Sequence, residues 1–415
     1  MSIHVIGILG LVLVFVIGTT RPINLGALAL VATFLVGAIV VGESPREMYG
    51  GFPVDLLVLL AGITYLFGIA SNNGTVEWIV EGSTRLAGDR RALIPWVVFV
   101  VASLPAMAGA LGSAGVALLA PLALGIARRY DIDRRMIGLM VVHGAAAGNF
   151  SPLNVLGAIV QQAVASNGLA FSASSLFFGN VAYNVVLAGI IFVVFGGLTL
   201  TRRLAVTASD TPEAMPAMRL RTDQACTLLA LLGVATGAIG FGLPIGFLAF
   251  TAAAILHLAF PLSSAGAEKK IAWNVVLLVC GIVTYVAALQ RYGTVDAVGD
   301  GIAGLSTPLV TALLLCAVGA VTSAFASSAG ILGALIPLAV PFMATGAIST
   351  TGMVVALAIS ATAVDATPFS TVGALVVANA DDDERLHVFR GLLWWGVAMV
   401  LTAPLATWLL FILPG

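Results

Sequence analysis

Long apolar runs separated by short polar segments dominate this chain of 415 residues. Most runs reach the length that a helix needs to cross a bilayer, about 20 residues. A transmembrane barrel would instead show alternating segments of about ten residues. The pattern therefore predicts an all-α polytopic membrane protein. The runs are 3–20, 23–42, 54–72, 91–129, 136–165, 175–199, 223–241, 244–262, 272–291, 307–345, 350–379 and 387–413.

Weaker segments complete the pattern. Segments 74–88 and 294–305 are short and more polar, so we expect interfacial helices there. Residues 200–222 form a polar linker rich in arginine. The first run, Ile3 to Thr19, has no basic flank before it and no small-x-small cleavage site after it. We therefore expect a first span rather than a cleavable signal.

Glycine, proline and small polar residues interrupt four of the runs. Unwound backbone inside a membrane persists only where protein or a wet cavity surrounds it. The interruptions are matched in the two halves of the chain, so we interpret them as parts of a site rather than as kinks in packing helices. The breaks lie at 109–115 in run 91–129, at 148–154 in run 136–165, at 323–330 in run 307–345 and at 364–371 in run 350–379.

The two halves also share the order and spacing of their landmarks. Pro152 follows Pro121 by 31 residues, and Pro368 follows Pro337 by the same 31 residues. The motif Ile63-Thr64-Tyr65 likewise matches Val283-Thr284-Tyr285. Equal spacing between separate landmarks predicts an internal repeat.

Composition excludes several classes of protein. Hydrophobic residues make up 60% of the chain and charged residues only 9%, against roughly 25% charged in a soluble domain. A soluble enzyme, a nucleic-acid-binding protein and a disordered regulator are therefore excluded. Cys226, Cys280 and Cys316 lie in apolar runs at no metal-ligand spacing, so we expect core residues rather than a disulfide or zinc site.

Basic residues orient the spans. If the N-terminus lies outside and the two broken double runs are re-entrant hairpins, only Arg46 and Arg291 of the 18 lysines and arginines lie outside. Hairpins that crossed fully would move the cluster Arg128–Arg135 outside. We therefore predict two inverted repeats in the cell inner membrane, each with five transmembrane helices and one re-entrant hairpin, and both termini outside.

Inverted repeats with paired broken helices are typical of secondary transporters, whose substrate and ion sites lie near the bilayer midplane. No lysine or arginine lies within a predicted hydrocarbon core, so an anion would be bound by N–H groups at half-helix starts, hydroxyls and amides. The predicted substrate contacts are Ser113, Asn149, Ser151, Pro152, Asn154, Ser327, Ser328, Thr367, Pro368, Ser370 and Thr371. The predicted cation contacts are Ser113, Gly148, Asn149, Ser328, Asp365 and Ala366, with no further metal and no cofactor.

Two ionisable residues in the broken spans need a separate interpretation. Asp365 is the most deeply placed carboxylate, and such residues are functional by default. It could cap the half-helix that follows, but we favour a role with a cation; Asn149 is its neutral counterpart. For His143 we favour a packed, hydrogen-bonded side chain over a proton relay.

These features resemble the ion transporter superfamily, whose best-known branch is the divalent anion:sodium symporter family. The N-terminal half and the motifs GNFSPLN (148–154) and DATPFSTVGAL (365–375) look like the MatC-type dicarboxylate (malonate) carriers. The symporters carry a Ser-Asn-Thr motif at each hairpin tip. This chain has Gly112-Ser113-Ala114 and Ser327-Ser328-Ala329 there, without the asparagine and threonine.

The resemblance implies an elevator transporter with a scaffold domain, which holds a homodimer contact, and a transport domain. The scaffold would comprise 1–90 and 223–306, with 200–222 as a cytoplasmic linker. The transport domain would comprise 91–199 (hairpin 91–129, broken helix 136–165, helix 175–199) and 307–415 (hairpin 307–345, broken helix 350–379, helix 387–413).

The leading functional interpretation is import of a small dicarboxylate, malonate-like or of C4 size, coupled to a cation. We expect Na⁺, with H⁺ as the alternative. The expected partners are the dicarboxylate, the lipid bilayer and a second copy of the chain, and no nucleic acid. A Na⁺/H⁺ or other inorganic-ion antiporter on the same scaffold is the second interpretation. An intramembrane enzyme is a distant third, because no nucleophile with a base, acid pair or metal cluster is evident.

Overall fold

In the computed structural model all regular secondary structure is helical, and no strand occurs among the described residues. The predicted all-α fold is confirmed. Most of segments 74–88 and 294–305, and most of the linker 200–222, lie outside the described residues. The described residues are 2–414 except 22, 77, 80–90, 203–219, 295–296, 298–306, 325–327, 345 and 347.

The helices follow the predicted runs closely in both halves of the chain. The first half contains α1 (Ile3–Thr20), α2 (Leu25–Phe34) with its π-helical continuation η1 (Leu35–Val41), α3 (Pro45–Tyr49), α4 (Val54–Asn72), η3 (Arg91–Leu93), α6 (Ile94–Met107), α7 (Gly112–Arg129), α8 (Arg134–Gly148), α9 (Val155–Ala165), α10 (Ala173–Val194) and α11 (Gly197–Arg202). The second half contains α12 (Thr222–Phe241), α13 (Ile245–Ala259), α14 (Pro261–Ser264), η4 (Ala267–Lys270), α15 (Trp273–Arg291), α17 (Pro308–Ser323), α18 (Ser328–Ala344), α19 (Thr350–Ala363), η5 (Val364–Ala366), α20 (Thr371–Ala378), α21 (Arg385–Thr407) and η6 (Trp408–Ile412).

Two predicted boundaries need correction. The run 175–199 is not one helix, because Gly196 takes a left-handed φ of 87° after Val194 and separates α10 from α11. The predicted break 109–115 in the first hairpin contains Gly109, Gly112 and Gly115, and of these only Gly109 lies in the turn, with φ 104°. Gly112 and Gly115 lie inside α7. A glycine in an apolar run does not by itself indicate whether it lies in the turn or in the helix that follows.

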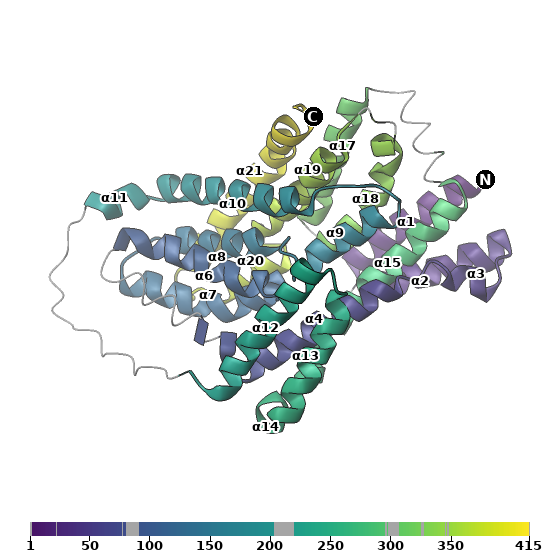
Figure 1. The fold of residues 1–415 in the computed structure, drawn as a ribbon. Coiled ribbons are helices and arrows are strands. Elements are labelled where there is room, and N and C mark those ends of the chain that lie inside the picture. The colour runs from purple at the N-terminus through teal and green to yellow at the C-terminus, as the bar shows by residue number, and fades with distance from the viewer. Residues whose placement is uncertain are drawn as a thin grey trace.

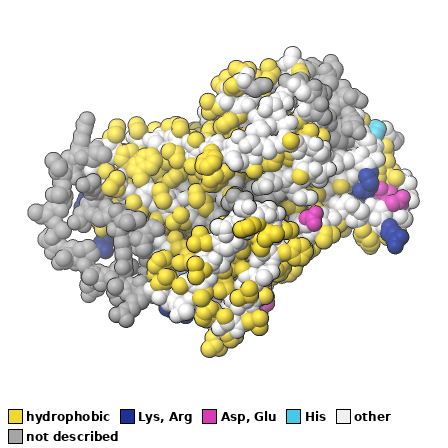
Figure 2. All heavy atoms as spheres, in the orientation of Figure 1, with side chains coloured by type: hydrophobic (Ala, Val, Ile, Leu, Met, Phe, Trp, Pro, Cys, Tyr) yellow, Lys and Arg dark blue, Asp and Glu magenta, His cyan; other side chains and the backbone are white. Residues whose placement is uncertain are grey.

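The outer surface suits a bilayer. Five helical segments in the described part of the chain are long and apolar enough to cross a membrane, and shorter apolar helices of 10–17 residues accompany them. Large apolar side chains such as Leu258, Phe241 and Trp394 are exposed. Figure 2 shows hydrophobic side chains across most of the visible face, with most charged side chains toward its edges. The chain is therefore a multi-pass membrane protein. The five segments are Val54–Asn72, Ala173–Val194, Pro261–Arg291, Thr350–Ala378 and Arg385–Ile412.

Helices of the first half of the chain pack directly on helices of the second half. Helix α2 packs on α15, and α4 packs on α13 (Figure 1). Glycine is required at both crossings. A Cβ on Gly26 would lie 1.9 Å from the Leu277 carbonyl oxygen, and one on Gly246 would lie 2.8 Å from backbone atoms of Leu59. Gly26 and Gly246 are each the second residue of their helix.

A second group of helices surrounds the four interrupted segments. Helices α6 and α7 pack on α8, and α17 and α18 pack on α19. Here too, elements of one half pack on elements of the other: α20 packs on α7, and α18 packs on α9 (Figure 1). This packing places both hairpins beside both broken spans.

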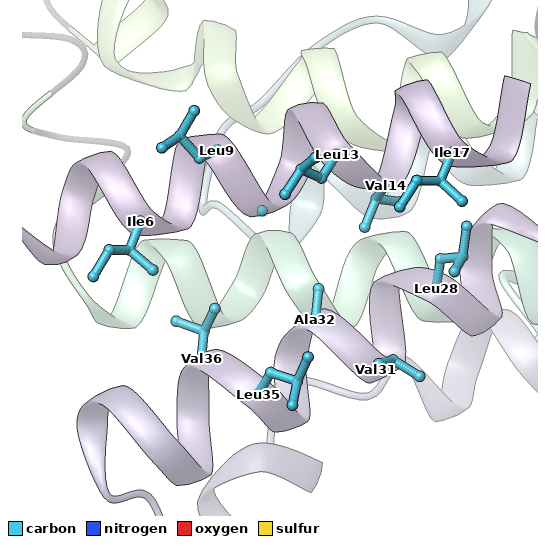
Figure 3. A pocket seen from close by; sticks show the side chains of 11 residues that line it. Ile6, Leu9, Leu13, Val14, Ile17, Leu28, Val31, Ala32, Leu35 and Val36 are labelled. Carbon is cyan, nitrogen blue, oxygen red and sulfur yellow. The ribbon is translucent and has the colours of Figure 1, made fainter. Parts of the chain in front are cut away.

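An apolar groove of about 330 Å³ lies between α1 and the stretch from α2 to η1. Figure 3 shows Ile6, Leu13 and Ile17 from α1 across the groove from Leu28 and Leu35. Its side chains are all apolar, so it offers no group that could bind an anion or a cation. The candidate site therefore has to be sought at the interrupted segments.

Candidate functional site

The first hairpin turn is held by the break in the first broken span. The turn connects α6 to α7, and the break lies between α8 and α9. Asn154 donates from Nδ2 to the carbonyl oxygens of Ala106 at 2.8 Å and Ala110 at 3.0 Å. Ser151 Oγ donates to the carbonyl oxygen of Met107 at 2.8 Å. Turn and break thus form one polar unit inside an apolar bundle.

The second half builds a related unit with different side chains. Thr367 Oγ1 donates to the carbonyl oxygen of Ala324, which follows α17, at 2.9 Å. Ser370 Oγ lies 2.5 Å from the Asp365 carbonyl oxygen and 2.9 Å from the Thr367 carbonyl oxygen, either of which can accept its proton. It accepts from the Gly373 N–H at 3.0 Å, so Ser370 caps α20. In the sequence, Thr367 and Ser370 are one residue before and two residues after Pro368, as Ser151 and Asn154 are relative to Pro152.

Asp365 is joined to the start of the second hairpin's return helix. Ser328 Oγ donates to Asp365 Oδ1 at 2.7 Å and lies 2.9 Å from Ser323 Oγ. Ser328 is the first residue of α18, whose N-terminus carries partial positive charge. The capping role considered for Asp365 is wrong, because the cap of α20 is Ser370. The carboxylate is left facing the hairpin.

Asn149, at the position equivalent to Asp365, has a different environment. It is buried, with 4% exposure, and its Oδ1 has no hydrogen-bond partner in the described part of the chain. A Cβ on Gly112, the first residue of α7, would lie 3.5 Å from that oxygen. The matched prolines set a register one residue away from that of the two tip motifs and make Gly112 the equivalent of Ser328: each lies nine residues before Pro121 or Pro337, and each is the first residue of its helix. The missing hydroxyl explains the unpartnered oxygen.

The remaining predicted residues differ in their surroundings. Ser113 is half-buried in the first turn of α7, and Ala366 and Pro368 are buried. Gly148 has a packing role, because a Cβ there would lie 2.6 Å from the Ser103 carbonyl oxygen of α6. Pro152 and Thr371 are exposed. Ser327 lies outside the described residues.

The two half-sites are adjacent. Helix α8, which Asn149 caps at its C-terminus, contacts η5, which carries Asp365, and α9 and α20 pack on the opposite hairpins. The arrangement gathers helix N-termini, amide groups, hydroxyls and one carboxylate, with no lysine or arginine among the predicted site residues. Such a set can bind an anion through N–H and O–H groups and a small cation through oxygen atoms.

His143 forms a closed hydrogen-bond chain behind the first break. Trp395 Nε1 donates to His143 Nε2 at 2.8 Å, and His143 Nδ1 lies 2.9 Å from Asn184 Oδ1. A tryptophan N–H can only donate, so Nε2 carries the lone pair and Nδ1 carries the proton. Both ring nitrogens are occupied, which agrees with the packed role favoured from the sequence.

The chain continues to the end of α8. Asn184 Nδ2 donates to the Asn180 carbonyl oxygen at 2.9 Å, and Asn180 Nδ2 donates to the carbonyl oxygens of Ala146 at 2.8 Å and Ala147 at 3.2 Å. These carbonyls belong to the last turn of α8, where helical bonding ends; the Ala146 carbonyl oxygen also accepts from the Asn149 N–H at 3.1 Å. The sequence analysis missed Asn180 and Asn184. Two asparagines one turn apart in an apolar run were the available signal.

A polar pocket of about 160 Å³ lies outside the spans, where the α7–α8 loop meets the α20–α21 loop. Arg128 pairs with Asp381 at 3.2 Å and Arg134 with Glu384 at 3.5 Å, so the two loops are side by side. The pocket is lined by Asp131, Ile132, Asp133, Arg134, Glu384 and His387.

Asp133 fixes the start of α8 in this region. It accepts from the Arg135 backbone N–H at 2.8 Å and pairs with the Arg135 guanidinium at 2.6 Å. Burial raises the pKa of the Asp133 carboxyl, but the hydrogen bonds and charge of Arg135 outweigh burial and hold the pKa below its usual value of 3.8. The folded state therefore favours the ionised carboxylate.

Replacing Asp133 by asparagine is expected to lower stability by about 1 kcal/mol near neutral pH, because the cap is kept and the ion pair is lost. A group with a lowered pKa stabilises the fold above its unfolded pKa and loses that effect as pH falls through its folded pKa. The gap between wild type and variant should therefore close below about pH 4. Thermal unfolding in detergent across this pH range measures it. Asp382→Asn is the control, since that side chain is 91% exposed; a pH-independent gap would contradict the assignment.

Comparisons with known proteins agree with this architecture. Residues 1–149 match the family model described as the N-terminus of the dicarboxylate carrier protein MatC. The fold is similar to the crystal structure of the Alcanivorax borkumensis YdaH transporter, with 14% sequence identity, 92% of this chain and 96% of that chain covered, and a TM-score of 0.58. No curated protein matches the chain. The family match agrees with the resemblance seen in the N-terminal half of the sequence and supports a transporter, and residues 1–149 of this multi-pass membrane protein are similar to the N-terminal region of the MatC dicarboxylate carrier.

Proposed function

We propose that the protein is a secondary active transporter that imports a small dicarboxylate, malonate-like or of C4 size, in symport with Na⁺. The observation that carries the proposal is the convergence of two hairpins and two broken spans on one polar site, in a chain with the N-terminal region of dicarboxylate carriers. Paired broken helices are how transporters bring ion and substrate sites to the bilayer midplane.

The substrate site in this proposal uses helix N-termini instead of basic side chains. Helices α7, α9, α18 and α20 each begin at a break or a hairpin turn, so their first N–H groups can bind carboxylate oxygens. Ser113, Asn149, Ser151 and Asn154 would bind one carboxyl group of the substrate. Ser328, Thr367 and Ser370, with Ser327, Pro368 and Thr371, would serve the other.

The cation site in this proposal is centred on Asp365. Its carboxylate, the carbonyl oxygens of the second break and the hydroxyl of Ser328 offer the oxygen ligands that a hard monovalent cation prefers. One cation bound there would offset part of the substrate's charge, because no lysine or arginine is among the site residues. H⁺ in place of Na⁺ is the alternative, and uptake measurements distinguish the two.

Alternating access in this proposal uses an elevator movement of 91–199 and 307–415 against 1–90 and 223–306, which would also hold a homodimer contact. The matched crossings α2–α15 with α4–α13, and α7–α20 with α18–α9, support two inverted repeats. The ion pairs Arg128–Asp381 and Arg134–Glu384 support hairpins that begin and end on the same side of the membrane, because double runs that each crossed only once would place these two loops on opposite sides. Both termini would then lie outside the inner membrane.

The function is tested by uptake of radiolabelled malonate and succinate into proteoliposomes of the purified protein. An inward Na⁺ gradient is compared with an inward H⁺ gradient and with no gradient. We expect uptake to exceed that of the control without a gradient only when an inward Na⁺ gradient is present. Uptake driven by an H⁺ gradient alone would show that the coupling ion is H⁺ rather than Na⁺. The absence of dicarboxylate uptake under every gradient would overturn the proposed substrate class, and Na⁺/H⁺ exchange would be tested next.

A further inference from the structure

The start of α7 is a helix N-terminus without an internal cap. Leu111, which precedes this 18-residue helix, makes no side-chain capping bond. The N–H groups of Ala114 and Gly115 bond to the Leu111 carbonyl oxygen. Within the described residues, the N–H groups of Gly112 and Ser113 have no acceptor. Two N–H donors therefore point out of the helix end.

A buried acceptor faces the same point. Asn149 is 96% buried, its Oδ1 receives no hydrogen bond from the described residues, and the oxygen lies 3.5 Å from the Cβ position of Gly112. A buried amide oxygen without a donor is rare in folded proteins, because it loses its bonds to water without replacement. The oxygen therefore points to a ligand that donates.

The second half-site shows what the first half-site lacks. There the equivalent of Gly112 is Ser328, and its hydroxyl donates to Asp365 Oδ1 at 2.7 Å. The first half-site has no hydroxyl at that position, so its acceptor is left for a donor from outside the chain. The two half-sites therefore differ in the chemical group that they complement.

We propose that the half-site formed by Asn149 and the first turn of α7 binds a carboxyl group of the substrate in its protonated form. The carbonyl oxygen of this group accepts from the free N–H groups of α7, and its hydroxyl donates to Asn149 Oδ1. The inference rests on the proposed dicarboxylate function and names the transported species as the monoanion, with the ionised carboxylate on the side of α18 and α20.

Two other occupants fit these atoms less well. A carboxylate presents only acceptors, so it would satisfy the N–H groups of α7 but set an oxygen against Asn149 Oδ1. A cation would satisfy Asn149 Oδ1 but would lie against the positive end of an 18-residue helix. A protonated carboxyl group has one acceptor and one donor side by side, as this half-site requires.

Two monoanions that differ in a single group test the proposal. Malonamate ends in a carboxamide, which accepts and donates as a protonated carboxyl group does. Acetoacetate has the same charge and shape but ends in a methyl ketone, which cannot donate. Sites that hydrogen-bond a donor discriminate strongly against analogues without it. By calorimetry on the full-length protein in detergent with saturating Na⁺, malonamate is expected to bind at least about tenfold more tightly than acetoacetate.

The variant Gly112→Ser tests the same point from the protein side. Its Cβ meets only Asn149 Oδ1, at an ordinary contact distance of 3.5 Å, and its hydroxyl can donate to that oxygen as Ser328 does to Asp365. We expect the preference for malonamate over acetoacetate to fall to within about twofold and malonate binding to weaken about tenfold. Gly125→Ser is the matched control, since a Cβ there, on the same helix, contacts nothing within 4 Å.

The outcomes separate the two proposals. Equal binding of malonamate and acetoacetate beside tight malonate binding would overturn the protonated half-site and leave the dicarboxylate function standing. An unchanged preference in Gly112→Ser would overturn the role of Asn149 in the same way. If malonate, malonamate and succinate all fail to bind the wild-type protein, the proposed function fails, and this inference fails with it.

Discussion

Replacing Asp365 by asparagine is expected to reduce Na⁺-driven dicarboxylate uptake by about 100-fold, equivalent to about 2.7 kcal/mol. Asparagine has nearly the same shape, and its Oδ1 can still accept the hydrogen bond that Ser328 donates at 2.7 Å. The variant therefore keeps the packing of the second break and removes only the negative charge. Losing one partner of a buried charge pair typically costs 2–5 kcal/mol.

Initial uptake rates into proteoliposomes, measured across a range of Na⁺ concentrations, test this expectation. The Na⁺ concentration for half-maximal uptake should rise steeply in Asp365→Asn, while thermal stability in detergent stays close to wild type. Asp381→Asn is the matched control, because it removes a carboxylate from an exposed surface ion pair. Full Na⁺-dependent uptake by Asp365→Asn would show that the cation site lies elsewhere.

The positions of the breaks were predictable because the sequence marks them with residues of unusual conformational behaviour. Pro152 and Pro368 fall inside the breaks, and Gly109 takes a φ of 104° in the first hairpin turn. Few other residue types could occupy such positions, so local sequence determines local structure there. The spans were predictable from the length of the apolar runs, because the thickness of the bilayer sets the length of a helix that crosses it.

The partners of the buried polar groups were not predictable in this way. Asn154 bonds to carbonyls 44 and 48 residues earlier, and His143 bonds to Trp395, 252 residues later. No local pattern records such pairings, because they depend on how the helices pack. The sequence matched Asn149 with Asp365, but only the structure reveals that Gly112 leaves Asn149 without a donor while Ser328 serves Asp365.

Replacing Gly26 by alanine is expected to destabilise the protein by about 3 kcal/mol, although alanine favours helix over glycine by about 1 kcal/mol. A Cβ on Gly26 would lie 1.9 Å from the Leu277 carbonyl oxygen, so α2 and α15 would have to separate along their crossing. The same reasoning predicts a loss in Gly246→Ala, whose Cβ would lie 2.8 Å from Leu59 backbone atoms at the α4–α13 crossing. Yield of monodisperse protein and thermal unfolding in detergent measure both. Gly233→Ala in α12, where a Cβ meets nothing within 4 Å, should be neutral or slightly stabilising; if Gly26→Ala matched it, the close crossing of the two halves would be refuted.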